Sequence, residues 1–502
     1  MIAPLFDPLA HLPILLVIVP LIAALVAGFL RNGTLAFGLA LAVNWILPVM
    51  AIALLAQVLL TGPVSYHIGG WEPPWGIEYR VDALNGFVLV LVSVVGALIM
   101  PFAWRSVRRE LEAERQAWFY CMYLLCLTGL LGIAVTGDAF NAFVFMEISS
   151  LSTYVLIALG RDRRALLAAF QYLIMGTIGA TFYVIGVGLL YLATGTLNMV
   201  DLADRLGDAA AIQPRTVVTG LAFLVVGISL KLALFPLSAW LPAAYAFAPS
   251  VVTIFLAATA TKVAIYLLIR LLFSIVGPSV GFAVSPVAEM VIGLSLIAIF
   301  VASLIAVFRV DLKRMLAYSS LAQIGYITMG IGIANQPSLT GGIVHLVNHA
   351  ITKAGLFMAV GCIVYRTGTV SLTELAGIGR RMPLTMAAFT IAGLGLIGAP
   401  GTVGFISKWY LVIGALRDGA PWLAFVIAAS SLLTMVYIGH VLEVAWFRPT
   451  APALAGASDP PLSMLLPLLA LAAATICFGI DTSWTAGIAS QIAEGLVGGA
   501  SR

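Results

Sequence analysis

Two histidines and a lysine recur at four-residue spacing in the segment HLVNHAITKAGLF: His345, His349 and Lys353. On a helix this spacing places the three side chains on one face. Each of them can take up and release a proton, so the row could pass protons along the helix. His345 and His349 also have the HxxxH spacing of a zinc pair, but no glutamate follows the first histidine and no third ligand is evident in the sequence. We therefore expect proton transfer and no metal site.

Lysines inside apolar stretches are the second unusual feature. Of the five lysines, Lys231, Lys262, Lys353 and Lys408 lie within such stretches, and Lys313 is expected in a loop. Placing a lysine at mid-membrane costs about 2.5–3.5 kcal/mol, so such residues face a protein or water interior and commonly mark an ion or proton path. Glu147, in NAFVFMEISSLSTYVL, is the mid-span acid that could balance one of them.

A structural alternative is that buried ion pairs only fix the register of neighbouring helices. One pair would fit that alternative. Four lysines, two histidines and one mid-span acid fit it poorly, because unpaired buried ammonium groups destabilise a protein unless they release their protons readily. The sequence thus favours a relay bridged by water.

The composition places these residues in a membrane. The chain of 502 residues is 62% hydrophobic and 9% charged, with a mean hydropathy of +1.10. Soluble proteins carry about 25% charged residues, so a soluble globular chain is excluded. A formal charge of +4 without a basic tail gives no reason to expect nucleic acid.

Other cofactor motifs can be dismissed from the sequence. The four cysteines contain no CxxC pair, which argues against an iron–sulfur or haem motif. The string GLGLIG at 393–398 follows no strand and lies inside an apolar span, so it is no dinucleotide site. We expect no bound cofactor, and any redox or hydrolytic chemistry would belong to partner subunits.

The apolar stretches define the architecture. A span needs about 20 apolar residues, and polar or Gly/Pro breaks divide the chain into about fourteen such runs. The expected fold is an all-α polytopic membrane protein forming one membrane domain, residues 1–502, with spans near 12–30, 35–60, 84–104, 116–136, 139–160, 166–193, 216–241, 250–275, 284–308, 313–333, 341–364, 384–411, 421–447 and 462–480.

The basic residues predict the orientation of these spans. Cytoplasmic loops carry an excess of Lys and Arg. With an extracytoplasmic N-terminus, fifteen basic residues fall in cytoplasmic loops: Arg31, Arg105, Arg108, Arg109, Arg115, Arg161, Arg163, Arg164, Arg309, Lys313, Arg314, Arg366, Arg380, Arg381 and Arg448. Six fall on the other side: Arg80, Arg205, Arg215, Arg270, Arg417 and Arg502. We therefore expect both termini on the extracytoplasmic side of the cell membrane, the inner membrane where there are two.

Helix breakers interrupt two of the expected spans. Pro236 follows Lys231 in the seventh span, and Gly398, Pro400 and Gly401 precede Lys408 in the twelfth. Broken helices at membrane depth are tolerated where they line protein or water, and in transporters they point to the ion path. The two spans run in opposite directions, which predicts two inverted five-helix repeats, spans 4–8 over residues 116–275 and spans 9–13 over residues 284–447.

Six ordered motifs carry a resemblance to a known family. They are LTGDAFNAFVFMEISSLSTY, KLALFPLSAWLPAAYAFAPS, AATATKVAIYLLIRLLF, DLKRMLAYSSLAQIGY, HLVNHAITKAGLF and GAPGTVGFISKW. Together they resemble the antiporter-like subunits shared by respiratory complex I, membrane-bound hydrogenases and Mrp-type cation/proton antiporters. The resemblance covers roughly residues 75–447, and the segment TGTLNMVDLA makes the D-type subunit of the Mrp antiporters the most similar member.

The resemblance implies a role for each protonatable residue. Glu147 matches the acid of the family's fifth helix, which pairs with the lysine of the broken seventh, here Lys231. Lys262 matches the central lysine of the eighth helix, and Lys408 the last relay residue of the twelfth. His345, His349 and Lys353 match the polar stripe of the eleventh helix, which joins the two halves. These seven residues form the expected proton relay.

The chain also departs from the family pattern. The family usually has WLPDAH where this chain has WLPAAY, so Ala243 and Tyr245 replace an acid and a histidine, and the role of that loop in proton uptake is open. In DLKRMLAYSS, Asp311 can simply cap a helix whose Lys313 and Arg314 obey the positive-inside rule.

Three function classes follow from these features. The first is the proton-translocating subunit of a multi-subunit cation/proton antiporter that exports Na⁺ or a similar cation. The second is the pump module of an NADH:quinone oxidoreductase-like or hydrogenase complex. The third is a stand-alone uniporter or scaffold. In the first two the partners are other membrane subunits, protons and the lipid bilayer, and the sequence does not separate them.

Overall fold

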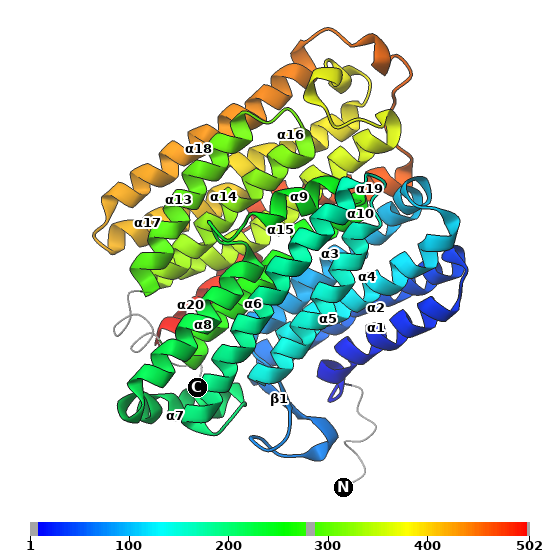
Figure 1. Ribbon diagram of the computed structural model, residues 1–502. Helices are drawn as coiled ribbons and strands as arrows, with labels where there is room; N and C mark the ends of the chain where they lie inside the picture. The colour runs from blue at the N-terminus through cyan, green and yellow to red at the C-terminus, as the bar shows by residue number, and fades with distance from the viewer. Residues whose placement is uncertain (1–8, 278–286, 499–502) are drawn as a thin grey trace.

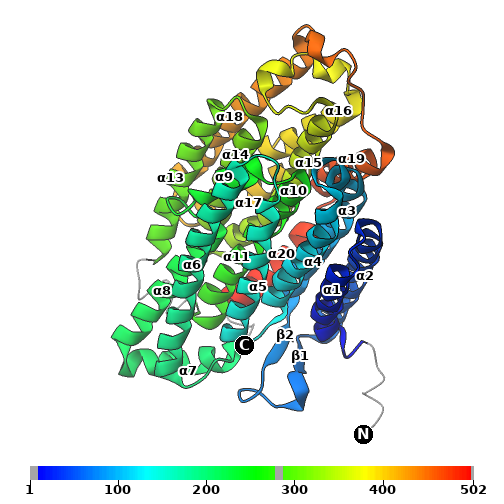
Figure 2. The same ribbon diagram turned by 45° about the vertical axis from the view of Figure 1, so that its right-hand side comes forward.

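The computed structural model describes residues 9–277 and 287–498, which form a bundle of long helices running side by side (Figure 1, Figure 2). The first half of the bundle comprises α1 (Leu12–Phe29), α2 (Gly33–Thr61), α3 (Ala83–Glu110), α4 (Ala113–Val135), α5 (Ala139–Ala158), α6 (Arg164–Thr194), α7 (Met199–Ile212), α8 (Pro214–Leu232), α9 (Trp240–Phe247), α10 (Ser250–Ala258), α11 (Ala260–Ile269) and the π-helical turn η3 (Arg270–Ile275).

The second half of the bundle also consists of helices. It comprises α13 (Val287–Val307), α14 (Leu312–Ile333), α15 (Gln336–Thr367), α16 (Pro383–Ile397), α17 (Val403–Arg417), α18 (Pro421–Leu442), α19 (Leu462–Ile480) and α20 (Ile488–Gly498).

Two short strands lie between α2 and α3. These strands, β1 (Val64–His67) and β2 (Glu78–Val81), pair antiparallel, with Val64 opposite Val81.

The expected membrane spans coincide with these helices. Among the described residues, twelve helices are long and apolar enough to cross a membrane. Two further expected spans correspond to α14, which has similar length but more polar residues, and to the broken pair α16–α17. The first residues of the expected span 284–308 lie outside the described part of the chain. The chain is thus an all-helical multi-pass membrane protein, while the two five-helix repeats stay a prediction.

Three elements were not expected from the sequence. Residues 61–82 contain the β1–β2 hairpin, residues 199–212 form α7, and residues 488–498 form α20. The placement of Lys313 in a loop was wrong, because it is the second residue of α14 and its side chain is buried, with Nζ donating to the backbone oxygen of Ala248 at 3.3 Å.

The ends of the helices are fixed by polar caps. Asp82 accepts from the backbone N–H groups of Leu84 and Asn85 and so starts α3, and Asn198 starts α7 in the same way. Such side chains satisfy N–H groups that lack partners inside the helix. Asp311 caps α14 as the sequence suggested, with its side chain accepting from the N–H of Arg314.

Four of the basic residues assigned to the cytoplasmic side lie together at one end of the bundle. Arg109, Arg161, Arg164 and Lys313 line a common cavity of about 350 Å³ there. The hairpin and α7 lie at the opposite, lower end in Figure 1, where His11, just before α1, contacts the Tyr66 hydroxyl at 3.1 Å. These four residues and the hairpin thus lie at opposite ends of the bundle, as the count of basic residues predicted.

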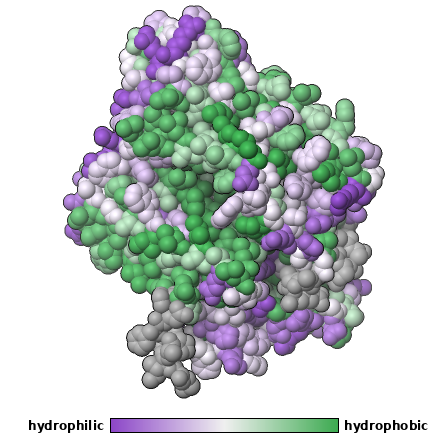
Figure 3. All heavy atoms as spheres, turned by 180° about the vertical axis from the view of Figure 1, so that it is seen from behind, coloured by the Kyte–Doolittle hydropathy of each residue, from purple (hydrophilic) through white to green (hydrophobic). Residues whose placement is uncertain are grey.

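The surface has the distribution expected of a bilayer protein. Figure 3 shows hydrophobic side chains across the middle of the rear face and hydrophilic ones toward its upper and lower ends. Large apolar residues such as Phe425 and Leu432 on α18 are exposed. In a membrane these side chains contact lipid, so their exposure carries no solvation penalty.

Helix α15 occupies the centre of the bundle. It packs against α10, α14, α16, α17 and α19, and its residues from Pro337 to Ile363 are all buried. A helix that is hydrophobic nearly all round belongs in such a position, so the polar row His345, His349 and Lys353 is held inside protein rather than facing lipid.

Candidate functional site

The acid of the predicted relay lies on α5 and meets the lysine of α8. Lys231 Nζ is 3.7 Å from Glu147 Oε1 and donates a shorter hydrogen bond of 2.6 Å to Ser150 Oγ. Glu147 keeps 24% of its side chain exposed, whereas that of Lys231 is 6% exposed. The resemblance implied this pair, and the structure brings the two residues together as a loose ion pair at the edge of the bundle.

The position of Lys231 depends on the break after α8. The helix ends at Leu232, Ala233 adopts a left-handed conformation with φ of 61°, and Pro236 lies in the irregular segment before α9. The lysine thus sits in the last turn of α8, where free backbone carbonyls favour a cation.

A small cavity adjoins Lys231. It measures about 30 Å³ and is lined by Ser149, Ser150 and Thr153 on α5 and by Ala260 and Val263 on α11. A water molecule needs about 10–15 Å³ of such space and two or more polar partners, and both conditions are met here. Water can therefore bridge from Lys231 toward the segment that carries Lys262.

Lys262 follows a second break that the sequence did not reveal. Thr259, between α10 and α11, has φ of −124° and ψ of −57°, which interrupts the helix three residues before the lysine. Lys262 is fully buried, and its Nζ donates to the backbone oxygen of Ala257 and, at 3.4 Å, to Thr261 Oγ. The break frees the carbonyl that holds the ammonium group.

The three residues of α15 differ in how they are held. His345 is fixed at both ring nitrogens, with Nδ1 2.8 Å from Ser407 Oγ and Nε2 3.0 Å from Gln323 Oε1. Lys353 donates to the backbone oxygen of Leu316 at 2.8 Å and to Ser319 Oγ.

His349 lies between them, and its ring differs from theirs in how it is held. Its ring is 6.3 Å from that of His345 at an interplanar angle of 15°, and neither of its nitrogens has a partner within the described residues. Buried polar groups are nearly always satisfied, so an exception calls for a water or a functional role. Lys262, Lys353 and His345 are the titratable groups that act electrostatically on this ring.

Lys408 stands at the other end of the row, on α17. Its Nζ donates to the backbone oxygen of Ile397 at 2.7 Å and to Ser431 Oγ at 2.8 Å. The carbonyl of Ile397 is free because α16 ends there: Gly398 has φ of +87°, Pro400 follows, and Gly401 has φ of +80°. A cavity of about 570 Å³ between α16, α17 and α18 opens beside the lysine at the surface.

The turn before Lys408 requires a glycine at one further position. A Cβ atom on Gly404 would lie 1.8 Å from the backbone oxygen of Gly395, far inside van der Waals contact. The two broken halves, α16 and α17, can therefore approach only where no side chain intervenes.

The structure adds groups that sequence reasoning missed. The Tyr326 ring on α14 lies between Lys408, whose Nζ is 4.9 Å from the ring centroid, and His345, at 5.6 Å between centroids. Its hydroxyl lies 2.5 Å from Ser430 Oγ. The signal was present in DLKRMLAYSSLAQIGY, because Ser319, Gln323 and Tyr326 recur at three- and four-residue spacing and so form one polar face of the helix.

The seven predicted residues lie on α5, α8, α11, α15 and α17. We call this set, taken in the order from Glu147 and Lys231 through Lys262, Lys353, His349 and His345 to Lys408, the row. All except Glu147 are buried. Among the described residues no group of three or more His, Cys, Asp or Glu side chains could hold a metal ion.

Comparisons with known proteins show the family of this chain. The family model described as NADH:quinone oxidoreductase/Mrp antiporter, TM, matches residues 136–434. The chain is 42% identical over 489 residues to NADH-quinone oxidoreductase subunit N of Desulforudis audaxviator, covering 94% of this chain and 96% of that protein. It is 32% identical to the D-type subunit of the Na(+)/H(+) antiporter of Alkalihalophilus pseudofirmus, covering 86% and 85% respectively.

A solved structure shows the same fold. A chain of the membrane-bound sulfane sulfur reductase, an archaeal respiratory membrane complex, superposes with a TM-score of 0.90 at 31% identity, covering 97% of this chain and 98% of that one. The chain described here therefore belongs to the antiporter-like membrane subunit family shared by NADH:quinone oxidoreductases and Mrp antiporters.

Proposed function

We propose that this chain conducts protons along the row from Glu147 to Lys408 as one subunit of a multi-subunit monovalent cation/proton antiporter, with Na⁺ as the expected cation. The observation that carries the relay is the burial of six protonatable side chains, three of which, Lys231, Lys262 and Lys408, lie beside helix breaks. Buried ionisable groups of this kind are expensive in a membrane and are kept for transport.

The hydrogen bonds suggest how a proton could move. Lys231, Lys262, Lys353 and Lys408 each donate to a hydroxyl or a backbone carbonyl, and those acceptors can hold the amine whether it is charged or neutral. His349, without a fixed partner among the described residues, is free to exchange a proton with either side. A relay needs members that are held loosely enough to change protonation state.

The antiporter assignment draws on the relative from the Na(+)/H(+) antiporter of Alkalihalophilus pseudofirmus and on the TGTLNMVDLA segment. A second function is favoured by another observation: the relative named NADH-quinone oxidoreductase subunit N has the higher identity, 42%. In that case the same row would serve as the pump module of a redox complex, driven by electron transfer in partner subunits.

One experiment separates the two. The complex is purified from its native membrane, its subunits are identified by mass spectrometry, and it is reconstituted into vesicles with a pH-sensitive dye. An antiporter collapses a preformed pH gradient when Na⁺ is added and needs no electron donor. A redox pump builds a gradient only with a donor and carries subunits with cysteine clusters. A purified complex that moves no protons under either condition would contradict the proton-conducting role itself.

A further inference from the structure

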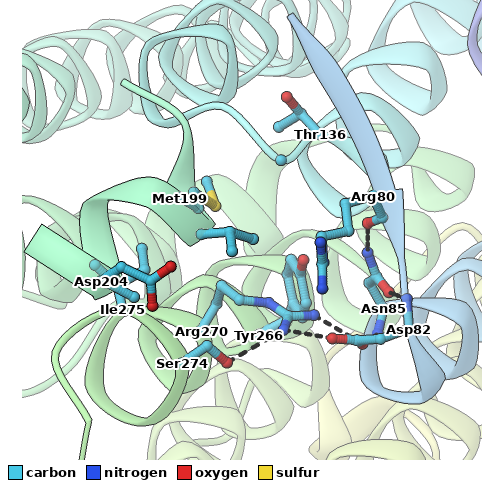
Figure 4. Close-up of a pocket in the computed structure, with 13 residues that line it drawn as sticks. Arg80, Asp82, Asn85, Thr136, Met199, Asp204, Tyr266, Arg270, Ser274 and Ile275 are labelled. Atoms are coloured by element: carbon cyan, nitrogen blue, oxygen red, sulfur yellow. Dashed lines mark hydrogen bonds and ion pairs between the residues drawn. The ribbon is translucent and has the colours of Figure 1, made fainter. Parts of the chain in front are cut away.

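A cavity of about 150 Å³ lies at the hairpin end of the bundle, outside the relay described above (Figure 4). It is enclosed by the hairpin, the start of α3, the end of α4, α7, α11 and η3. Its charged lining groups are Arg80, Asp82, Asp204 and Arg270. The volume has room for several water molecules at about 10–15 Å³ each. The positive-inside count places this end on the extracytoplasmic side.

A row of polar residues leads from mid-membrane to this cavity. Lys262, Tyr266, Arg270 and Ser274 follow one another at four-residue spacing along α11 and η3, so each lies about one turn beyond the last. The last three line the cavity. Tyr266 donates its hydroxyl to the backbone oxygen of Ala134 at 3.1 Å, and it is buried. These four residues mark one helix face that runs from the turn of Lys262 to one end of the bundle, and water would have to bridge Lys262 and Tyr266 because Lys262 Nζ bonds to Ala257 and Thr261.

An ion pair closes the row where it meets the cavity. Arg270 makes two hydrogen bonds to Asp82, from Nη1 to Oδ2 at 2.6 Å and from Nη2 to Oδ1 at 2.9 Å, and Nη1 also donates to Ser274 Oγ at 3.1 Å. Figure 4 shows the guanidinium lying between Asp82 and Ser274, with Tyr266 beside it. A fixed arginine in a narrow passage repels protons and cations.

Resting on the relay proposed above, we propose that this cavity is a proton port of the subunit and that the Asp82–Arg270 ion pair is its gate. In the closed state Arg270 blocks the passage. A proton passed from Lys262 through the Tyr266 hydroxyl to the carboxylate of Asp82 makes that group neutral, so Arg270 is released. The proton then leaves Asp82 for water in the cavity, and the carboxylate that is left takes Arg270 back.

Several charged and polar groups line the cavity together with Asp82. Facing it are Arg80 from β2, Tyr266 and Arg270 from α11 and η3, and Asp204 from α7. Arg80 makes only a long ion pair with Glu78, with Nη1 3.8 Å from Oε1, and its side chain is 31% exposed. Asp204 is exposed at the cavity wall and offers a second acceptor for a departing proton.

The alternative is that the pair is a clamp that joins the start of α3 to η3 and moves nothing. A clamp and a gate predict different behaviour of an assembled complex. Removing a clamp lowers the amount or thermal stability of the complex but opens no path. Removing the charge of a gate instead leaves the path open, so protons leak through it without cation exchange or electron transfer.

The test measures proton leak and thiol block in vesicles containing the purified complex. Arg270→Gln should dissipate a pH gradient several-fold faster than wild type when no partner cation or electron donor is present. The matched control is Arg205→Gln, which removes an arginine paired with an aspartate on the same end, Arg205 Nε to Asp201 Oδ1 at 2.8 Å, but outside the cavity. That variant should leak no faster than wild type.

The second arm does not depend on the folding of Arg270→Gln. In a background in which the exposed Cys477 is replaced by serine, a cysteine is placed at Ala203, which lines the cavity, or at Asp208, which is exposed on the same helix outside it. An impermeant cationic thiol reagent is added from the hairpin side, and flux after labelling is divided by flux before labelling in each variant. The ratio should fall strongly for Ala203→Cys and stay near one for Asp208→Cys.

Two results would overturn the proposed proton port. One is that assembled Arg270→Gln complex leaks protons no faster than wild type, and the other is that labelling of Ala203→Cys leaves the proton flux unchanged. If Arg270→Gln does not assemble, the labelling ratio alone decides. Wild-type complex that moves no protons would instead contradict the proposed function, so the two failures are told apart by the wild-type trace.

Discussion

Lys231 lies 3.7 Å from the Glu147 carboxylate but only 2.6 Å from the hydroxyl of Ser150. The lysine is therefore held by a neutral group at least as closely as by its counter-charge, and Glu147 Oε1 has no hydrogen-bond partner within the described residues. A pair that served only to lock α5 against α8 would be expected to bond directly, because a buried pair repays its desolvation only with good geometry. The loose contact suits a pair whose protonation changes.

Glu147→Gln tests this interpretation of the pair. A purely structural pair would leave a buried ammonium unmatched at a cost of about 3–5 kcal/mol, and the complex should be lost. In a relay Lys231 can shed its proton and keep its bond to Ser150, so the complex should persist with transport gone. Glu147→Asp, which keeps the charge with a shorter reach, should retain a fraction of the activity. Proton flux is compared with abundance on an immunoblot, and normal flux in Glu147→Gln would remove Glu147 from the relay.

His349→Ala should abolish proton flux while the complex stays assembled, because within the described residues the ring makes no hydrogen bond that holds the fold. His440, on α18, is the matched control: its ring is half exposed and lies 3.7 Å from Glu443, outside the row. His440→Ala should therefore transport as wild type. A His349→Ala complex with undiminished flux per assembled complex would argue that the two halves are joined elsewhere.

The orientation predicts labelling from opposite sides. Arg108, at the end of α3, and His67, at the end of β1, are both exposed and lie at opposite ends of the bundle. With Cys477 replaced, a cysteine at Arg108 should react with an impermeant thiol reagent only from the cytoplasmic side, and one at His67 only from outside. Labelling of both from one side would overturn the fifteen-to-six assignment of basic residues.

The ionised carboxylate of Asp82 should stabilise the folded protein at neutral pH, and this stabilisation should disappear in acid. Burial alone would raise the pKa of Asp82, but the charge and hydrogen bonds of Arg270 outweigh it and hold the pKa below its usual range. A carboxyl group with a lowered folded-state pKa stabilises fully above its unfolded pKa of about 3.9, and the stability is lost as the pH falls through the folded value. Asp82→Asn should thus cost about 3 kcal/mol near neutral pH and progressively less below about pH 4.

Thermal unfolding of the detergent-solubilised complex, followed by tryptophan fluorescence from about pH 3 to pH 7, measures that difference. Subtracting the stability of the variant from that of wild type at each pH removes the contribution of the other carboxylates, which the two proteins share. A gap that stays constant as the pH falls would mean that Asp82 is not ionised in the folded protein.

Gly404→Ala should destabilise the complex by about 3 kcal/mol or prevent assembly, because the added Cβ meets the backbone oxygen of Gly395. Gly439, on α18, lies in a comparable membrane helix, and a Cβ atom added there would meet no described atom within 4 Å. Gly439→Ala should leave the melting temperature unchanged or raise it slightly. Equal melting temperatures for the two variants would contradict the close approach of α16 and α17.

Much of the fold could be predicted because hydropathy alone defines membrane spans. The runs of apolar residues located the long helices, and Pro236 and Gly398 marked breaks that the structure shows between α8 and α9 and between α16 and α17. The break at Thr259 had no such marker, since a threonine is compatible with a helix. The hairpin at residues 64–81 was missed because its two strands are only four residues each and lie in a segment rich in glycine and proline.

The sequence could predict which residues belong to the candidate site but not which side chains contact one another. A lysine in an apolar span is recognisable as a candidate because burying it in a membrane costs free energy, and the resemblance assigned these lysines to one relay. Neither could show that Tyr326 lies between Lys408 and His345, or that Gln323 fixes one nitrogen of His345, because these contacts join α14 to α15 and α17 through tertiary packing. The lack of a partner for His349 among the described residues is likewise a property of the assembled bundle.

The most direct test of the relay is proton flux per assembled complex for Lys408→Ala, because this residue ends the row and its hydrogen bonds go to Leu396, Ile397 and Ser431, none of them a relay member. Purified wild-type and variant complexes are placed in vesicles at equal amounts, and flux is followed with a pH-sensitive dye. The relay predicts that the variant assembles in normal amounts and moves protons no faster than empty vesicles. Wild-type flux through Lys408→Ala would contradict it.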